Sequence, residues 1–371
     1  MSNNYFYTSL EELCCSNLKQ AFNRDTLIFD RQIDQQQWQP TLGTENLTST
    51  CICLISIDRA EIKPSEIGFN PTQTFNALLK LAQSKPYPGG IGLIIWANAV
   101  WEMKSLAELQ QQLSIPFENL TAYLTSLTTM ETAWLVSGLL HEYQRHPAAK
   151  TKEYLDIALN TLLNRYQPTS HLMVHAAANA PWSHRLRRWV ANFADQIYPV
   201  QAFAFAAIAG GNDSAKQTAE SLAKQLTKLQ GELGQWWWHY NPRNGEVLQF
   251  YPVYSVHQYG MAPMALAALQ AAQGSNFNLA VQRGRDWLEH NELNLKMIDR
   301  QANTVWRDIE YHQTLLKQII RKTNSLRGKP AKLTANQFNL KLNYETRPYE
   351  WGWCLYAGAI ESGINKKLHI V

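Results

Sequence analysis

Three short stretches of the sequence combine acidic, basic and aromatic residues in a way that suits acid–base chemistry. They are FADQIY at 193–198, YPVYSVHQYGMA at 251–262 and ETRPYEWGW at 345–353. Each stretch leads into an apolar segment, so its polar side chains are expected at the edge of a buried element. Histidine is the common acid or base near neutral pH, and a pair of carboxyl groups can cleave a glycosidic bond. The three stretches therefore hold most of the candidates for catalysis.

Five residues are the candidates for this chemistry, and most have a plain structural alternative. His257 is the first candidate for a base or acid, and a buried histidine bonded to a backbone carbonyl is its alternative. Asp195 could instead cap a helix, and Glu350 could complement a helix dipole. Asp308 could form a surface ion pair with Arg307. The predicted catalytic set is His257, Asp195, Glu350, Asp308 and His239.

Aromatic and polar residues near these candidates form the predicted substrate-binding set. Tryptophan and tyrosine rings can stack on the C–H faces of sugars and can also stabilise cations. Arginine can hold a carboxylate through two parallel hydrogen bonds, and it can also bind hydroxyl groups. The set is Trp237, Trp238, Tyr240, Arg243, Tyr198, Tyr254, Gln258, Tyr259, Arg307, Tyr349 and Trp353.

The segment GQWWWHYNPRNG predicts a β-hairpin, because strand-forming residues precede an Asn/Pro/Gly turn and others follow it. Strict alternation places Trp237 and His239 on one face. Trp236, Trp238 and Tyr240 then share the other face. One face is expected to anchor the hairpin on the helices and the other to meet a ligand.

No metal or cofactor site is predicted. The sequence lacks H-x-x-x-H, H-E-x-x-H and any cysteine–histidine cluster. It also lacks the phosphate-binding G-x-x-x-x-G-K-[ST] pattern and the nucleophile pattern G-x-S-x-G. A further histidine, His175 in LMVHAAA, is expected to be structural.

The elements that must position these residues follow a repeat. PVQAFAFAAIAG at 199–210 and PMALAALQAAQG at 263–274 both begin with Pro, continue with small apolar residues and stop at Gly. This predicts two matching buried helices, each followed by an amphipathic helix and a hairpin. Further buried segments begin near 90, 131 and 348. A period of this size predicts stacked helical pairs that close into a ring.

The residues from Gln230 to Trp236 read Q-x-x-x-G-x-W, which is similar to the repeat that joins helices to turns in triterpene cyclases. Together with the repeat, this makes residues 75–365 resemble the α/α-toroid superfamily. The resemblance implies a mainly α fold, an α/α toroid in which a barrel of inner and outer helices carries short β-hairpins at one mouth. Two branches are compatible with it. One is the six-hairpin glycosidase-like group of unsaturated glucuronyl hydrolases, sugar 2-epimerases and some polysaccharide lyases, and the other is the terpenoid cyclase and prenyltransferase group.

The glycosidase-like branch implies an enzyme that hydrolyses, eliminates or epimerises a sugar or glycan by acid–base chemistry. A terpenoid cyclase should carry a D-x-D-D-like run or an aspartate-rich D-D-x-x-D motif, and the sequence has neither. The carbohydrate-active enzyme is therefore the favoured interpretation. An isoprenoid-handling toroid and a non-catalytic binding protein are the alternatives.

The expected domain organisation places an N-terminal appendage before the toroid. Residues 1–70 form this appendage, with TCICLISI at 50–57 as a strand, and residues 71–371 form the toroid domain. A basic insertion near 312–346 interrupts the last repeat and is expected to be a lid or a solvated loop.

Composition limits the partners and the location. The net charge of +4 is too small, and too evenly spread, to predict nucleic-acid binding. No apolar run reaches the roughly 20 residues that a membrane-spanning helix needs. Five sparse cysteines and a first segment unlike a signal peptide predict a cytoplasmic protein. A sugar or glycan is the expected partner, and the oligomeric state stays open.

Overall fold

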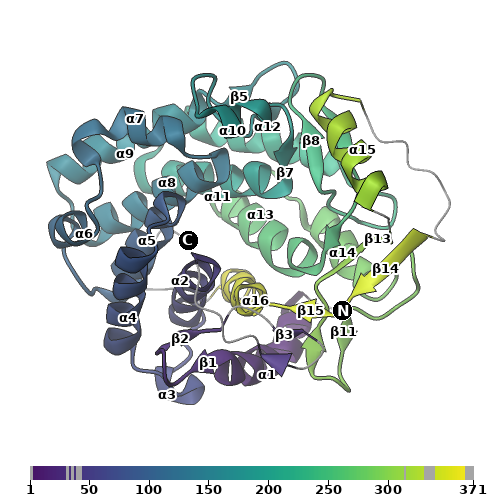
Figure 1. Cartoon of the computed structure of the whole chain (residues 1–371), viewed down its shortest axis with the longest axis horizontal. Coiled ribbons are helices and arrows are strands. Elements are labelled where there is room, and N and C mark those ends of the chain that lie inside the picture. The colour runs from purple at the N-terminus through teal and green to yellow at the C-terminus, as the bar shows by residue number, and fades with distance from the viewer. Residues whose placement is uncertain are drawn as a thin grey trace.

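The computed structural model describes residues 3–30, 33–34, 37–38, 44–312, 315–329 and 339–363. Six of its helices form a closed ring, in which each helix packs against the next and the last packs against the first (Figure 1). These inner helices are α2 (Thr44–Arg59), α5 (Ile91–Trp101), α8 (Thr129–Arg145), α11 (Phe193–Gly210), α13 (Ala262–Ala271) and α16 (Pro348–Glu361). The predicted α/α toroid is confirmed.

A second layer of helices lies outside the ring (Figure 1). The outer helices are α1 (Asn3–Ala21), α4 (Pro71–Ser84), α6 (Leu106–Leu113), α7 (Leu120–Ser126), α9 (Ala149–Leu163), α12 (Asp213–Leu229) and α14 (Asn278–Trp287). The inner helices are buried on all sides, whereas the outer helices are buried on one face. In α5 every residue from Ile91 to Ala99 is buried, whereas α12 buries one face that includes Ala215, Ala219 and Leu222. An amphipathic outer helix around an apolar inner helix is what the sequence pattern predicted.

The first 70 residues differ from the expectation. The segment 50–57, predicted as a strand, lies within helix α2, where Ile52 and Ile55 are almost fully buried. Helix α2 packs against both α5 and α16, and α1 packs against α16, so both helices belong to the ring rather than to an appendage. Burial by neighbouring helices here outweighs the strand preference of the isoleucines.

Two inner helices begin at capping boxes. Thr128 and Glu131 form a capping box at the start of α8, and Asn192 and Asp195 form one at the start of α11. Helix α11 therefore begins at Phe193, and Pro199 lies inside it rather than at its first residue as predicted. The cap moves the helix start upstream because it satisfies the backbone N–H groups that begin the helix.

Close packing fills the ring. A Cβ atom on Gly92 would lie 2.3 Å from the backbone nitrogen of Leu135, so α5 and α8 can approach only because this residue is glycine. In the interior, the ring of Trp96 lies 4.7 Å from that of His141 and 5.9 Å from that of Phe205. Burial lowers the pKa of His141 to about 3, so this histidine is a neutral part of the core.

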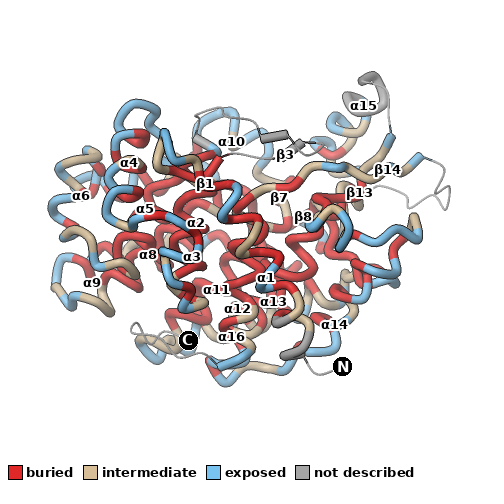
Figure 2. Tube along the Cα trace, turned by 90° about the horizontal axis from the view of Figure 1, so that it is seen from below, coloured by how far each residue is buried: buried red, intermediate tan, exposed pale blue. Residues whose placement is uncertain are grey.

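The strands are short and antiparallel, and β7, β8, β13 and β14 lie together along the upper side of the ring in Figure 2. The two-stranded sheets are β1 (Phe22–Asn23) with β2 (Ile28–Phe29), β5 (Tyr166–Gln167) with β6 (Leu172–Met173), and β11 (Ile298–Asp299) with β12 (Thr304–Val305). The three-stranded sheets are β7 (Ala191–Asn192), β8 (His239–Asn241) and β9 (Glu246–Gln249); β10 (Val253–Tyr254), β13 (Asp308–Tyr311) and β14 (Leu340–Asn343); and β15 (Glu345–Thr346), β3 (Ile33–Asp34) and β4 (Gln37–Trp38).

Short helical elements complete the chain. They are α3 (Pro64–Ile67), α10 (Trp182–Leu186), α15 (Leu315–Leu326), the 3-10 turns η1 (Pro88–Gly90) and η2 (Phe117–Asn119), and the π turn η3 (His257–Met261). The predicted basic insertion contains α15, β14 and β15, and its middle lies outside the described residues. Within the described ranges, no helix has the length and apolar character needed to cross a membrane.

Candidate functional site

Asp195, the third residue of α11, is completely buried and uses both carboxylate oxygens. Its Oδ1 accepts a hydrogen bond from the backbone nitrogen of Met130 at 3.1 Å. Its Oδ2 accepts one from the backbone nitrogen of Asn192 at 3.0 Å and one from Nδ1 of His175 at 2.7 Å. The helix-capping interpretation of Asp195 is therefore confirmed. The same carboxylate also orients a histidine.

His175 precedes α11 in the chain and was expected to be only structural. Its side chain is 7% exposed, and the hydrogen bond to Asp195 places the ring proton on Nδ1. Among the described residues, none forms a hydrogen bond with Nε2, which leaves that nitrogen as a free acceptor. The His184 ring lies 6.0 Å away. A histidine whose second nitrogen is held by a buried carboxylate has the arrangement of a general base.

Glu131 lies beside this pair and was missed by the sequence reasoning. Its Oε2 accepts from the backbone nitrogen and the hydroxyl of Thr128, and its Oε1 accepts from the Tyr87 hydroxyl at 2.7 Å. A Cβ atom on Gly89 would lie 2.0 Å from Oε1, so the approach depends on a glycine. The T-x-x-E spacing of a capping box was the available signal for this residue.

His239 begins strand β8 and is 8% exposed. Its Nδ1 donates to Oε1 of Gln249 at 2.5 Å, and its Nε2 faces the Arg187 guanidinium at 3.4 Å. Burial is the main cause that lowers the pKa of His239 to about 3, and the positive charge of Arg187 acts in the same direction. His239 is thus neutral near pH 7, with both ring nitrogens engaged.

His257 opens the π turn before α13 and is also neutral. Its ring lies 4.4 Å from that of Phe193 and 5.1 Å from that of Tyr254, and it stacks at 6.3 Å on Trp238. Burial lowers its pKa to about 3 although a backbone hydrogen bond at Trp236 opposes the shift. The π turn interrupts the helix, and such turns often occur at functional sites.

A second polar cluster surrounds Arg307, between β12 and β13. Its Nη1 lies 3.1 Å from Oε1 of Glu350 and 3.2 Å from Oε1 of Glu345. Its Nε lies 3.4 Å from Oδ2 of Asp308, and its guanidinium lies 5.0 Å from the centre of the Tyr254 ring. The predicted pairing of Arg307 with Asp308 is present, but it is buried rather than at the surface.

Burial dominates the electrostatics of this second cluster. It raises the pKa of Glu350 to about 7 and that of Asp308 to about 7, although Arg307 lowers both. Each carboxyl group also keeps one buried oxygen without a hydrogen bond among the described residues. Carboxyl groups in this state can hold or release a proton near neutral pH.

The structure brings only part of the predicted substrate-binding set to the ring entrance. Trp238, Tyr254 and Tyr349 are half-buried there, with Arg307 between them and the carboxyl groups. Arg243 lies on the hairpin tip, exposed and stacked on Trp189. The other predicted residues, each at most 4% exposed, lie in the core: Trp237, Tyr240, Tyr198, Gln258, Tyr259 and Trp353.

Strict alternation fails in the tryptophan run. Strand β8 begins only at His239, with an irregular register after that residue, so the three tryptophans precede the strand. Trp236 and Trp237 are both buried, and only Trp238 turns toward the entrance. The predicted division of the hairpin into two faces was therefore wrong.

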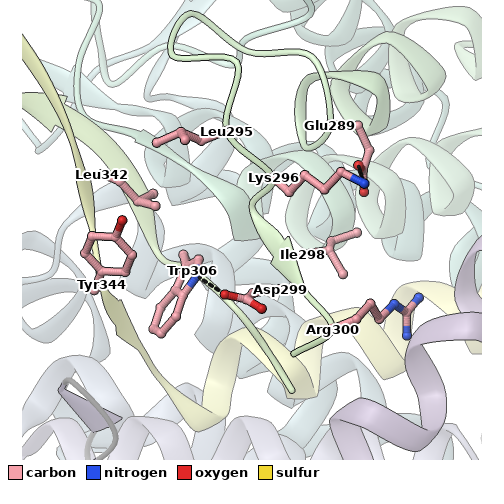
Figure 3. A pocket seen from close by; sticks show the side chains of 9 residues that line it. All are labelled: Glu289, Leu295, Lys296, Ile298, Asp299, Arg300, Trp306, Leu342 and Tyr344. Atoms are coloured by element: carbon pink, nitrogen blue, oxygen red, sulfur yellow. Dashed lines mark hydrogen bonds and ion pairs between the residues drawn. The ribbon is translucent and has the colours of Figure 1, made fainter. Parts of the chain in front are cut away.

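A pocket of about 540 Å³ lies away from these clusters, beside the β11–β12 hairpin (Figure 3). Trp306 and Tyr344 form its aromatic wall. The Asp299 carboxylate points at Trp306 Nε1, 3.2 Å away, and its other oxygen accepts from the backbone nitrogen of Gln301 (Figure 3). None of the predicted site residues lines this pocket.

The described residues contain no group of three or more His, Cys, Asp or Glu side chains placed to hold a metal ion. The expectation that the site uses no metal or cofactor stays a prediction.

Comparisons with known proteins show the fold. No protein-family model and no curated protein matches the sequence. A cellobiose 2-epimerase from Bacillus thermoamylovorans B4167 matches with a TM-score of 0.66 and 12% identity, over 97% of this chain and 100% of that one. A D-mannose isomerase matches with a TM-score of 0.63 and 12% identity, over 98% and 99%.

An unsaturated glucuronyl hydrolase specific for heparin matches with a TM-score of 0.59 and 10% identity, over 99% of both chains. The matches span the whole chain, including helices α1 and α2. At such low identity they speak for the fold alone. The chain therefore has the fold of the six-hairpin glycosidase-like α/α toroids.

Proposed function

We propose that the protein is a carbohydrate-active enzyme that moves a proton at a sugar carbon, with Nε2 of His175 as the base. The observation that carries this proposal is the hydrogen bond between His175 and the buried Asp195, which leaves Nε2 without a hydrogen bond among the described residues. The structural neighbours include enzymes named for sugar epimerisation, isomerisation and hydrolysis, which supports a sugar as substrate.

The carboxyl groups favour proton transfer at carbon over hydrolysis. Glycoside hydrolysis generally needs two carboxyl groups that reach the substrate, one as acid and one as base or nucleophile. Asp195 and Glu131 lie close to His175, but all of their oxygens already accept hydrogen bonds. Beside His175 the favoured reaction is therefore epimerisation or isomerisation, followed by elimination. Hydrolysis would have to use Glu350 and Asp308, which each keep one oxygen without a hydrogen bond among the described residues.

The Arg307 cluster supplies a proton and a positive charge in this proposal. His175 keeps the proton that it removes and later releases it to solvent, while Glu350 or Asp308, with pKa values raised to about 7, donates its own proton to the carbon. Arg307 stabilises the oxygen on which negative charge develops. Trp238, Tyr254 and Tyr349 provide faces for the sugar ring. The neutral His239 and His257, predicted as acid or base, act here as hydrogen-bonding and stacking partners.

Exchange in heavy water tests the proposal. The purified protein is incubated in D₂O with mannose, cellobiose and an unsaturated glucuronyl disaccharide, and proton NMR follows deuterium at the carbon next to the anomeric centre. We expect deuterium to enter at least one sugar. His175→Asn should slow the exchange by about 10²–10⁴-fold, since that is the usual contribution of a general base.

His290→Asn is the matched control, because His290 is exposed and lies on the outer helical layer. It should exchange like the unmodified protein. Cleavage to monosaccharides without deuterium at carbon would contradict the proposal in favour of hydrolysis. Thermal stabilisation by prenyl diphosphates alone would favour the isoprenoid alternative, and stabilisation by sugars without any reaction would favour a binding protein. The cytoplasmic location stays a prediction.

A further inference from the structure

Two arginines stack on one indole ring, that of Trp189, and a third arginine precedes them in the chain. Arg187 and Arg188 follow α10, and Arg243 lies at the tip of the β8–β9 hairpin. Pairing of β7 with β8 brings the two segments together (Figure 1). The Arg188 guanidinium lies 5.1 Å from the centre of the Trp189 ring, and that of Arg243 lies 4.8 Å from it. These three residues are called the arginine cluster below.

The arginine cluster carries positive charge without a matching carboxylate. Among the described residues, no carboxylate lies within 4.0 Å of a guanidinium nitrogen of any of the three arginines. Other arginines of the chain are paired, such as Arg285 with Glu361 and Arg145 with Glu142. Like charges held close together repel one another, so such a cluster is best explained by an anion that it binds.

The arginine cluster is joined directly to the proposed base. The backbone nitrogen of His175 donates to the carbonyl of Arg188 at 2.9 Å. Nη1 of Arg188 donates to the carbonyl of Ala176 at 3.0 Å. Arg187 reaches His239, whose pKa is itself shifted by the charges of Asp195 and His175. The arginine cluster is therefore fixed to the segment that carries His175 and to the neighbouring His239.

We propose that the arginine cluster binds a negatively charged group of the sugar substrate, a carboxylate or a sulfate. Guanidinium groups bind both through paired, charge-assisted hydrogen bonds, and Arg187 and Arg243 are exposed to solvent. Trp189 holds Arg188 and Arg243 in place by cation–π contact. The substrate class is thus an anionic sugar, an inference that rests on the proposed function.

The test compares binding of glucuronic acid, glucose 6-sulfate and glucose by isothermal titration at low and high salt. We expect at least one anionic sugar to bind about tenfold or more tightly than glucose, with the difference reduced at high salt. The variant Arg187→Gln/Arg243→Gln should lose this preference. The control Arg185→Gln should keep it, because Arg185 is exposed on the same segment. Thermal unfolding checks that the variants fold.

The two anionic sugars in the test distinguish a carboxylate ligand from a sulfate ligand. Preference for glucuronic acid identifies a carboxylate, and preference for glucose 6-sulfate identifies a sulfate; either supports the arginine cluster as an anion site. Equal binding of all three sugars, or equal losses of the anion preference in the cluster variant and in Arg185→Gln, overturns the anion site.

Exchange in D₂O is measured separately. Anion binding without exchange overturns the proposed function alone, and exchange confined to neutral sugars overturns the anion site alone.

Discussion

Three inner helices carry a carboxylate at their third residue, yet the carboxylates do different work. Glu131 in α8 and Asp195 in α11 complete capping boxes, and every oxygen is hydrogen-bonded. Glu350 in α16 follows Arg347, which makes no capping hydrogen bond, and it turns instead to Arg307. A capping residue before the helix therefore ties such a carboxylate to its own backbone as well as to distant partners, whereas Glu350, without a capping residue, contacts distant partners.

Replacing Arg307, the cation of the second polar cluster, should give the largest loss of stability. In Arg307→Gln, Glu350 and Asp308 would remain buried without their shared positive charge. We expect a loss of about 3–5 kcal/mol of unfolding free energy at pH 8, the usual cost of breaking a buried ion pair. Urea unfolding measures it, with the exposed Arg327→Gln as control. A loss no larger than that of the control would mean that Arg307 does not stabilise the buried Glu350 and Asp308.

The second prediction concerns pH. Burial raises the pKa of Glu350 from 4.5 to about 7, so the folded protein binds a proton that the unfolded chain has released. Stability from this group is complete below about pH 4.5 and falls as the pH rises through 7, by up to about 1.4 kcal/mol per pH unit. Glu350→Gln should remove this contribution to the slope and leave that of Asp308, whose pKa is also raised to about 7.

Urea unfolding midpoints, measured at several pH values between pH 5 and pH 8, give the slope of stability against pH for each variant. Glu310→Gln, on the neighbouring strand with Lys341 as its partner, is the control and should keep the slope of the unmodified protein. An unchanged slope in Glu350→Gln would show that this carboxyl group is ionised throughout the range.

The smallest effect should come from a cap. Thr128→Ala removes the hydroxyl that bonds Glu131 at the start of α8, and about 1 kcal/mol of stability should be lost. Asn119→Ala is the control, since Asn119 precedes α7 without a capping hydrogen bond. Equal losses of thermal stability in the two variants would mean that Glu131, like Glu350, depends on partners other than its cap.

The sequence predicted the helices better than it predicted the site. Five inner helices were found near their true starts because each carries an apolar run. The sixth, α2, was mistaken for a strand because its cysteines and isoleucines alternate and isoleucine is β-branched. Asp195 and Glu350 were predicted as catalytic carboxylates at helix starts. Both lie buried in the first turn of their helices, and their catalytic role stays a prediction, whereas Trp353 and Tyr259 were chosen for their ring type and lie in the core.

The role of His175 could not be predicted from the sequence. Its partner Asp195 is 20 residues away, and nothing in the intervening residues signals a contact between them. The capping box of Glu131 was readable, but its contact with Tyr87 joins two different helical pairs. A single sequence carries no record of such contacts.

By itself, the sequence determined a ring of alternating apolar and amphipathic helices with short hairpins, since these follow from local periodicity and from Pro, Gly and capping residues. Only the tertiary structure decided which polar groups meet. Ring closure brings α16 against α2 and sets Arg307 beside Glu350, and strand pairing brings Arg243 to Arg188. The physical reason is that hydrogen bonds and ion pairs act over a few ångströms, so groups far apart in the chain interact only after the helices have packed.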